Sequence, residues 1–236
     1  MSDRQDCVYL RQPIRRTVLL TKNQLLTKMK TLMLSAVFLC ASALLSAQTI
    51  QLPTPLRTGG KPLMDALNLR QSAREFDSAK SISNQTLSNL LWAAWGFNRE
   101  KKRTAPSSMD RQEIDLYAVT KEGIYRYDAA NNKLIQIVAG DYRKESGTQP
   151  YVGEVPLNIV FVCNKSKINS KSESGLIEAT YANSGFIAQN IYLFCASEGL
   201  ATVVRASIDK AKLAKVMNLT DDQLITLAQT VGYPKK

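Results

Sequence analysis

The stretch RTAPSSMDRQEIDLYAV, residues 103–119, is the most informative part of the sequence for the fold. In its second half, Ile114, Leu116 and Ala118 alternate with Glu113, Asp115, Tyr117 and Val119. This period-2 pattern predicts a half-buried strand. A Pro-Ser-Ser turn at 106–108 stands almost directly before that strand, although a plain loop would be enough to enter a sheet. Its small hydroxyl side chains and free backbone N–H groups indicate that something is bound there.

Helical and extended patterns alternate through the rest of the chain. Helices are predicted at 62–69, at 84–96 behind Ser83 as N-cap, and at 208–217. Extended patterns are found in a hairpin (123–127 with 133–138), a buried strand (157–163), a strand or loop (201–205) and a final strand (224–231). The predicted class is α+β, with a central, mostly antiparallel sheet flanked by helices.

The segment 181–199, YANSGFIAQNIYLFCASEG, predicts a long helix that is apolar nearly all round. Such a helix must be covered on all sides. Two interpretations remain open at this point: the helix lies at the centre of the fold, or it forms a subunit interface.

The composition excludes several classes of site. The 236 residues contain no histidine, which removes Ser-His-Asp and Cys-His nucleophilic sites and every His-ligated metal site. We therefore expect no metal. The net charge of +11 is no evidence for nucleic acid by itself, and the basic run NREKKR at 98–103 lacks interleaved aromatic residues for base stacking. We interpret that run as a solvated loop and expect no nucleic-acid partner.

The N-terminal part predicts export. Residues 29–47 have the basic start, apolar run and small residues of a secretory signal peptide, so Met29 is the expected true start. The apolar run is too short for a comfortable membrane span, and none is expected after cleavage. The expected organisation is a leader (1–47), an extended arm (48–60) and one domain (61–236), in a periplasmic or extracellular protein. Cys163 and Cys195 would then either join in a disulfide or remain separately buried thiols.

A second motif suits a phosphate group. Arg70, Ser72 and Arg74 follow one another at spacing i, i+2, i+4 at the end of a predicted helix. Two guanidinium groups and a hydroxyl can bind phosphate oxygens, since arginine pairs with them bidentately. The alternative is a solvated helix end in which Arg74 bridges Glu75 or Asp77.

Four segments in order carry a resemblance to a known family. They are R-Q-S-x-R at 70–74, A-P-S-S-x-D-x-Q at 105–112, G-x-x-A-Q-N-I-x-L-x-x-x-x-x-G-L at 185–200 and V-G-Y-P-K-K at 231–236. The chain resembles the nitroreductase family of flavoproteins, in particular its compact branch that includes azoline-type dehydrogenases. The resemblance implies an interlocked or dimer-swapped homodimer with two FMN sites at the subunit interface. It also implies ping-pong transfer of hydride or electron pairs, with NAD(P)H as a possible donor and a small organic molecule as acceptor.

The resemblance also implies roles for individual residues. Arg70, Gln71 and Ser72 match the motif that holds the FMN phosphate and ribityl chain, and Arg74 would reach the pyrimidine edge and stabilise charge there. No side chain is assigned as a catalytic acid or base, because the flavin itself carries the chemistry. The remaining matches are the turn beside the flavin ring (Pro106, Ser107, Ser108, Asp110 and Gln112), a loop over the ring (Val203, Val204, Arg205 and Ala206) and the closing basic residues (Lys235 and Lys236).

Asp110 departs from the family pattern, which commonly has asparagine there. An ionised aspartate only accepts hydrogen bonds, so Asp110 would accept from flavin N3–H or pair with Arg111. Its charge opposes that of reduced flavin and would lower the reduction potential. The alternative function is therefore an exported flavin-binding protein with little or no turnover. The sequence does not specify the substrate.

Overall fold

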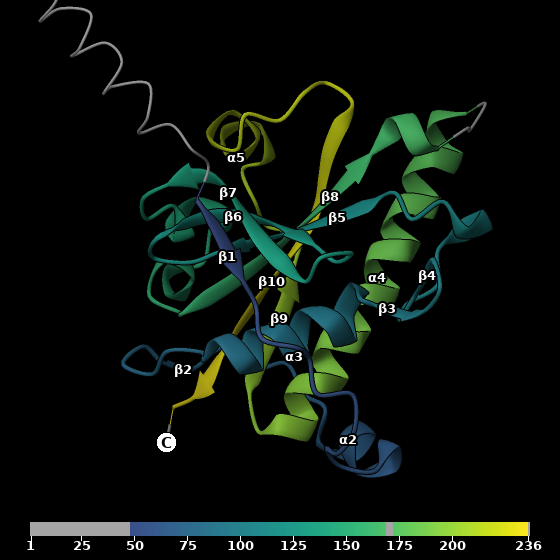
Figure 1. The fold of residues 1–236 in the computed structure, drawn as a ribbon. Coiled ribbons are helices and arrows are strands. Elements are labelled where there is room, and N and C mark those ends of the chain that lie inside the picture. The colour runs from purple at the N-terminus through teal and green to yellow at the C-terminus, as the bar shows by residue number, and fades with distance from the viewer. Residues whose placement is uncertain (1–47, 169–171, 236) are drawn as a thin grey trace, which may run out of the picture. The chain divides into compact units, whose positions relative to one another are not determined.

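The structure is a computed structural model, and it describes residues 48–168 and 172–235. The predicted leader, with Met29 and the cleavage site, lies outside the described residues. Figure 1 shows helices gathered around a sheet of long, twisted strands. Within the described part of the chain, no helix is long and apolar enough to cross a membrane.

The main sheet has eight strands, and every strand pair in it is antiparallel. In spatial order, the strands are β1 (Thr49–Gln51), β7 (Lys133–Ala139), β6 (Gly123–Asp128), β5 (Ile114–Val119), β8 (Leu157–Asn164), β10 (Gln223–Pro234) and β2 (Phe76–Asp77), with β9 (Ala201–Arg205) also pairing with β10. The predicted hairpin is β6–β7, and the segment 201–205 is a strand rather than a loop. The predicted α+β class is confirmed.

The strand β5 is buried on both faces, so the prediction of a half-buried strand is wrong. Ile114 and Leu116 belong to the core that also contains Trp95. Tyr117 and Val119 point to a second core on the opposite face of the sheet. The alternation in the sequence identified the strand. Tyr117 and Val119, at the alternate positions, are also apolar, and this indicates burial on both faces rather than on one.

The helices cover both faces of this sheet. They are α2 (Leu63–Leu69), α3 (Asn84–Trp95), α4 (Glu173–Glu198) and α5 (Lys210–Val216), and short 3₁₀ turns occur at Ser108–Asp110, Arg143–Ser146, Pro150–Gly153 and Lys165–Lys167. Ser83 caps α3 as predicted, since its hydroxyl accepts from the backbone N–H of Thr86 at 3.1 Å. The apolar residues of α3 and α4 form one core with β5 and β8, whereas Leu213 of α5 packs on the other face.

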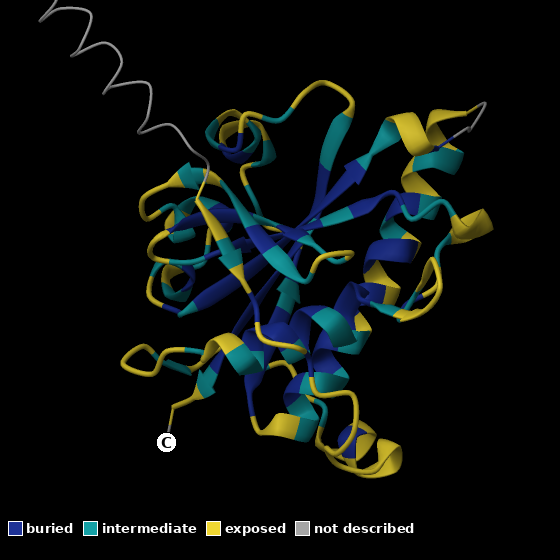
Figure 2. Cartoon of the chain, in the orientation of Figure 1, coloured by how far each residue is buried: buried dark blue, intermediate teal, exposed yellow. Residues whose placement is uncertain are grey.

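The helix α4 is buried on only one face within its own chain, so it does not lie enclosed at the centre of the fold, and the subunit interface stays a prediction. The helix begins at Glu173, well before Tyr181, and ends at Glu198, followed by Gly199, whose positive φ of 69° is the left-handed cap conformation. One face is buried in the core of its own chain, including Ile187 and Ile191. The opposite face is exposed and includes Phe186 with 47% of its surface accessible (Figure 2).

The segment 48–60 is largely extended, and it lies along other elements. Its first residues form β1, and Ser88 of α3 donates from its hydroxyl to the carbonyl of Pro53 at 2.5 Å. The basic run at 98–103 is not a plain solvated loop. It forms a small hairpin of β3 (Phe97–Arg99) and β4 (Lys102–Arg103), held where the Arg103 guanidinium stacks 4.0 Å from the centre of the Phe97 ring.

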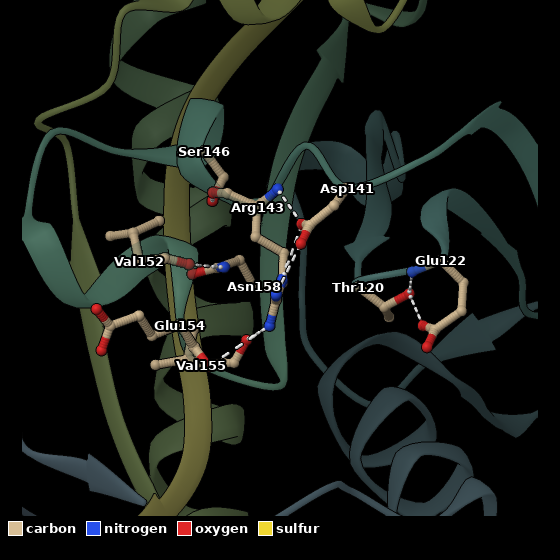
Figure 3. Close-up of polar contacts among 9 residues, drawn as sticks. All are labelled: Thr120, Glu122, Asp141, Arg143, Ser146, Val152, Glu154, Val155 and Asn158. Atoms are coloured by element: carbon tan, nitrogen blue, oxygen red, sulfur yellow. Dashed lines mark hydrogen bonds and ion pairs between the residues drawn. The ribbon is translucent and has the colours of Figure 1, made fainter. Parts of the chain in front are cut away.

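Hydrogen bonds from Arg143 hold the segment between β7 and β8 in place. Its guanidinium donates two hydrogen bonds to Asp141, at 2.9 and 2.7 Å, and one to the carbonyl of Val155 at 2.8 Å (Figure 3). The hydrogen bond from Arg143 lowers the pKa of Asp141. Asn158 adds a further tie, because its amide donates to the carbonyl of Val152 at 3.0 Å.

The two cysteines of the described domain remain separate. Cys163 and Cys195 are both free and buried, which agrees with the thiol interpretation and not with a disulfide. Burial raises the pKa of both thiols, so neither has the character of a reactive thiolate.

The buried Tyr127 predicts a loss of stability at alkaline pH. Burial raises its pKa from about 10 to about 12. Below pH 10 the phenol is neutral in both the folded and the unfolded state. Between pH 10 and 12 only the unfolded state loses the proton, so stability falls as pH rises through this window. The difference amounts to about 2 to 3 kcal/mol.

Replacing Tyr127 with Phe should flatten this part of the stability curve, as measured by urea unfolding at pH 8 to 11.5. Burial also raises the pKa of Tyr117, so some pH dependence should remain. A Tyr127→Phe variant with the same slope as the wild type would show that Tyr127 is not responsible.

Candidate functional site

The arginine motif at the end of α2 is tied to β9 through Tyr192 of α4. The Tyr192 hydroxyl lies 2.8 Å from Ser72 Oγ and accepts from the backbone N–H of Val204 at 3.0 Å. The Arg70 guanidinium lies 5.4 Å from the centre of the Tyr192 ring. The structure thus brings together the 70–74 motif and β9. Tyr192 was not predicted as a site residue, since its helix reads from the sequence as uniformly apolar.

The C-terminal segment joins the same group. β10 pairs with β2 through Tyr233 opposite Asp77, and the backbone N–H of Lys235 donates to the carbonyl of Glu75 at 3.4 Å. Lys235 is therefore beside the arginine motif, whereas Lys236 lies outside the described residues. Ala73, Tyr192 and Thr202 help to line a cavity of about 370 Å³ here.

Arg74 is not used to bridge the neighbouring acids. Asp77 pairs with Lys80 at 3.5 Å, and the described residues show no ion pair for Arg70, Arg74 or Lys235. Three cations thus lie in or beside one short stretch without a carboxylate partner in the described chain. We call Arg70, Ser72, Arg74, Tyr192, Val204 and Lys235 the arginine half-site. Its donor set suits a phosphate dianion.

The Pro-Ser-Ser turn lies on a different side of α4. The backbone N–H of Ser108 donates to Asn183 Oδ1 at 3.1 Å, and Ser107 Oγ accepts from the backbone N–H of Gln112 at 3.0 Å. Met109 and Asp110, both at φ 54°, and Gln112, at φ 49°, adopt left-handed backbone conformations that non-glycine residues rarely take. We call residues 106–112 with Asn183 the turn half-site. Asn183 was likewise not predicted.

The Asp110 carboxylate is paired within its own chain, but not with Arg111. Its Oδ2 lies 2.5 Å from Lys102 Nζ and its Oδ1 accepts from Gln112 Nε2 at 3.1 Å. The hydrogen bond from Lys102 lowers the pKa of this carboxyl group. Arg111 instead lies against the sulfur of Met109. The Gln112 side chain also holds the small hairpin, since its Oε1 accepts from Arg103 Nε at 2.9 Å.

Arg205 lies in the wrong place for a side-chain contact with a cofactor. Its guanidinium is buried, donates to the carbonyl of Ser146, and reaches Asn158 Oδ1 at 2.6 Å and Thr230 Oγ1 at 2.9 Å. Burial lowers its pKa to about 10. The prediction is corrected accordingly: Val203, Val204 and the backbone of Arg205 form β9, Ala206 follows its end, and the Arg205 side chain belongs to the interior.

The two half-sites lie on opposite sides of α4. Asn183 and Tyr192 are nine positions apart on this helix. An α-helix turns by about 100° and rises about 1.5 Å per residue, so the two side chains point about 180° apart and are separated by about 13 Å along the axis. Figure 1 shows α2 beside one end of α4, and β3 and β4 along another part of it. One chain therefore does not bring the two half-sites together.

The residues present fit a phosphate-bearing planar cofactor better than a metal ion. Within 48–168 and 172–235, no group of three or more His, Cys, Asp or Glu side chains could hold a metal. The arginine half-site offers cations without acid partners, and the turn half-site offers small side chains on a backbone fixed by side-chain hydrogen bonds.

Known proteins with similar sequences and structures share one family description. The family model described as Nitroreductase family matches residues 67–233. A candidate nitroreductase of Methanocaldococcus jannaschii, MJ1384, is 23% identical over 176 residues, which cover 70% of this chain and 88% of that protein. The crystal structure of a candidate nitroreductase from Ralstonia eutropha JMP134 is 41% identical, with a TM-score of 0.75, and the match covers 80% of this chain and 90% of that chain.

Two more distant structures share the fold. The NADPH:FMN oxidoreductase of Vibrio harveyi, complexed with NAD+, is 20% identical with a TM-score of 0.55, covering 74% of this chain and 69% of that chain. The microcin synthetase McbBCD complex of E. coli is 19% identical with a TM-score of 0.62, covering 79% of each chain. The family match, the fold and the order of the motifs lead to one conclusion: the chain belongs to the nitroreductase family.

Proposed function

We propose that this protein is an FMN-dependent oxidoreductase that transfers hydride or electron pairs to a small organic acceptor by a ping-pong mechanism. The observation that carries the proposal is the arginine half-site, where Arg70, Arg74 and Lys235 have no acid partner among the described residues. FMN rather than FAD fits, because the sequence contains no Gly-rich dinucleotide loop. The NADPH:FMN oxidoreductase of V. harveyi makes NAD(P)H a reasonable donor to test.

Each half-site would have its own task. Arg70, Ser72 and Lys235 would hold the phosphate. Arg74 would lie at the pyrimidine edge, where a cation stabilises the negative charge that appears on reduction. Pro106, Ser107 and Ser108 would lie along the flat ring. When bound, FMN supplies the redox chemistry, and the protein supplies binding, orientation and charge.

A second copy of the chain would complete the site. The exposed face of α4, with Phe186, lies opposite the buried face of the helix. The two half-sites lie on opposite sides of the helix, between these two faces. A homodimer packed over this face would place the arginine half-site of one protomer against the turn half-site of the other. Two equivalent sites at the interface would follow from the two-fold symmetry.

Asp110 supports a second candidate function, a flavin-binding protein with little turnover. A carboxylate at this position opposes the charge of reduced flavin, although the ion pair with Lys102 weakens that effect. Export, which the leader predicts, would also separate the protein from cytoplasmic NAD(P)H, so another donor would be required in the periplasm or outside the cell.

The test begins with the visible spectrum of the purified protein, followed by mass spectrometry of the released chromophore. We expect FMN; FAD, or no flavin after reconstitution, would contradict the proposal. Stopped-flow reduction by NADH, NADPH and quinols then separates the two functions. Fast reduction by at least one donor supports the oxidoreductase, and no reduction by any supports the flavin-binding protein.

Arg70→Ala should weaken FMN binding by about one to two powers of ten. A charge-assisted hydrogen bond to phosphate contributes roughly 1.5–3 kcal/mol, and 1.4 kcal/mol corresponds to a factor of ten. Riboflavin has no phosphate and should bind the variant and the wild type equally. The measurement is a fluorescence titration with both flavins.

Arg57→Ala is a matched control for this substitution. Arg57 also stacks on an aromatic ring, at 5.3 Å from that of Trp92, but it lies in the arm and outside both half-sites. Its replacement should leave FMN affinity unchanged. An Arg70→Ala variant that lost riboflavin as readily as FMN would remove Arg70 from the phosphate site.

A further inference from the structure

A buried carboxyl group lies directly behind the turn half-site. Glu113, at the entrance of β5, is fully buried, and its Oε1 accepts from Asn183 Nδ2 at 2.6 Å. Its Oε2 is buried and has no hydrogen-bond partner among the described residues. Asn183 is fully buried as well, and its Oδ1 accepts from the backbone N–H of Ser108 at 3.1 Å. A continuous chain of contacts thus runs from Glu113 through Asn183 to the turn.

The chemistry of a carboxylate fixes the order of donors and acceptors in the contacts from Glu113 through Asn183 to Ser108. A carboxylate can only accept hydrogen bonds, whereas an asparagine amide has one accepting and one donating end. Asn183 must therefore turn its Nδ2 to Glu113, which leaves its Oδ1 facing the N–H of Ser108. The reverse orientation would place oxygen against oxygen and N–H against N–H. Glu113 thereby selects the amide orientation that can hold Ser108.

Packing alone does not account for a glutamate at this position. A buried polar oxygen without a partner is costly, and an apolar side chain of similar volume would avoid that cost. The turn, on the other hand, needs a tether. Met109, Asp110 and Gln112 hold positive φ angles of 49–54°, and such conformations persist only where the surroundings enforce them.

We propose that Glu113 is a positioning residue, which orients the Asn183 amide and thereby fixes the Ser107–Ser108 turn against the cofactor ring. The part of this inference that concerns the ring rests on the proposed function. The tether itself does not, because all its contacts lie within one chain. The two parts are therefore tested by separate measurements.

The tether is tested by amide hydrogen exchange of the cofactor-free protein at Ser108, in three variants of nearly equal shape. Asn183→Asp places two carboxyl groups face to face and should speed exchange at Ser108 at least tenfold. Adding Glu113→Gln exchanges donor and acceptor in the hydrogen bond between residues 113 and 183. The new Gln amide can donate to the new Asp, whose other oxygen accepts from Ser108, so the double variant should recover protection.

Glu113→Gln alone should stay within about threefold of the wild type, because the Gln oxygen still accepts from Asn183. The amide of Thr104, which donates to the carbonyl of Gly96 at 2.9 Å, is a control outside the tether. Should Asn183→Asp fail to fold, recovery of a folded protein by the double variant is the same test. A double variant that exchanges as fast as Asn183→Asp, or an Asn183→Asp variant like the wild type, overturns the inference.

The link to the cofactor is tested by FMN titration of the same proteins. Asn183→Asp should weaken FMN binding by about tenfold, and the double variant should restore it. Equal FMN affinity in all variants, together with the expected exchange pattern, overturns the positioning role while the tether stands. A wild-type protein that binds no FMN contradicts the proposed function itself, and this result is recognised before any variant is compared.

Discussion

Arg205→Ala is expected to lower the free energy of unfolding by about 3–5 kcal/mol, the largest stability effect predicted for this chain. The Arg205 guanidinium donates to the carbonyl of Ser146 and to the side chains of Asn158 and Thr230 in the interior. No carboxylate lies within ion-pair distance of it among the described residues. Removing the guanidinium leaves buried acceptors unsatisfied and opens a cavity. The measurement is urea unfolding followed by circular dichroism.

Two further substitutions show whether the hydrogen bonds or the charge matter. Arg205→Lys keeps the charge but lacks the planar fork, so it should recover only a minor part of the loss. Arg126→Ala, on β6, removes an arginine for which the described residues show no ion pair or side-chain hydrogen bond, and it should change stability by less than about 0.5 kcal/mol. If Arg205→Ala lowers the free energy of unfolding no more than Arg126→Ala does, the stabilising role assigned to the buried Arg205 guanidinium is wrong.

Arg205 also illustrates how far sequence reasoning reached in the site. Position along the chain placed it correctly beside Val204, in the segment that the resemblance assigns to the cofactor. A strand, however, sends successive side chains to opposite faces. Arg205 therefore points inward although Val204 contacts Tyr192. The prediction for 201–205 left strand and loop open, so it did not say which side chains point inward, and the sequence does not show that Asn158 and Thr230 are the buried partners of Arg205.

The fold itself was more accessible to prediction than the contacts. Strands β5, β6, β7, β8 and β10 were each recognisable by alternation or by an apolar run, and Ser83 marked the start of α3. Short strands were missed, because two or three residues such as Phe76–Asp77 show no period. The central residues of the two half-sites, Tyr192 and Asn183, were missed for a different reason. Both lie on a helix that reads as apolar throughout, so the roles of the Tyr192 hydroxyl and the Asn183 amide are visible only from the residues that they contact in the structure.

Phe186→Glu is expected to abolish the dimer and cofactor retention together. In the single chain the Phe186 side chain is 47% exposed on the open face of α4. By two-fold symmetry, a substitution there enters the proposed interface twice. Burying two unpaired carboxylates should weaken association by at least about 4 kcal/mol, which is roughly a thousandfold. Light scattering and FMN titration on the same sample are the measurements.

The choice of Phe186 over a neighbouring position follows from the burial pattern. Ile191 is fully buried in the core of its own chain, so a charge there would unfold the monomer and say nothing about assembly. Ile137 on β7 is an exposed apolar residue remote in the sheet from α4, and Ile137→Glu adds the same charge outside the proposed interface. It should remain dimeric and bind FMN. Since one chain holds its half-sites on opposite sides of α4, a monomeric Phe186→Glu protein that still bound FMN tightly would contradict the shared site, even if the wild type is a dimer.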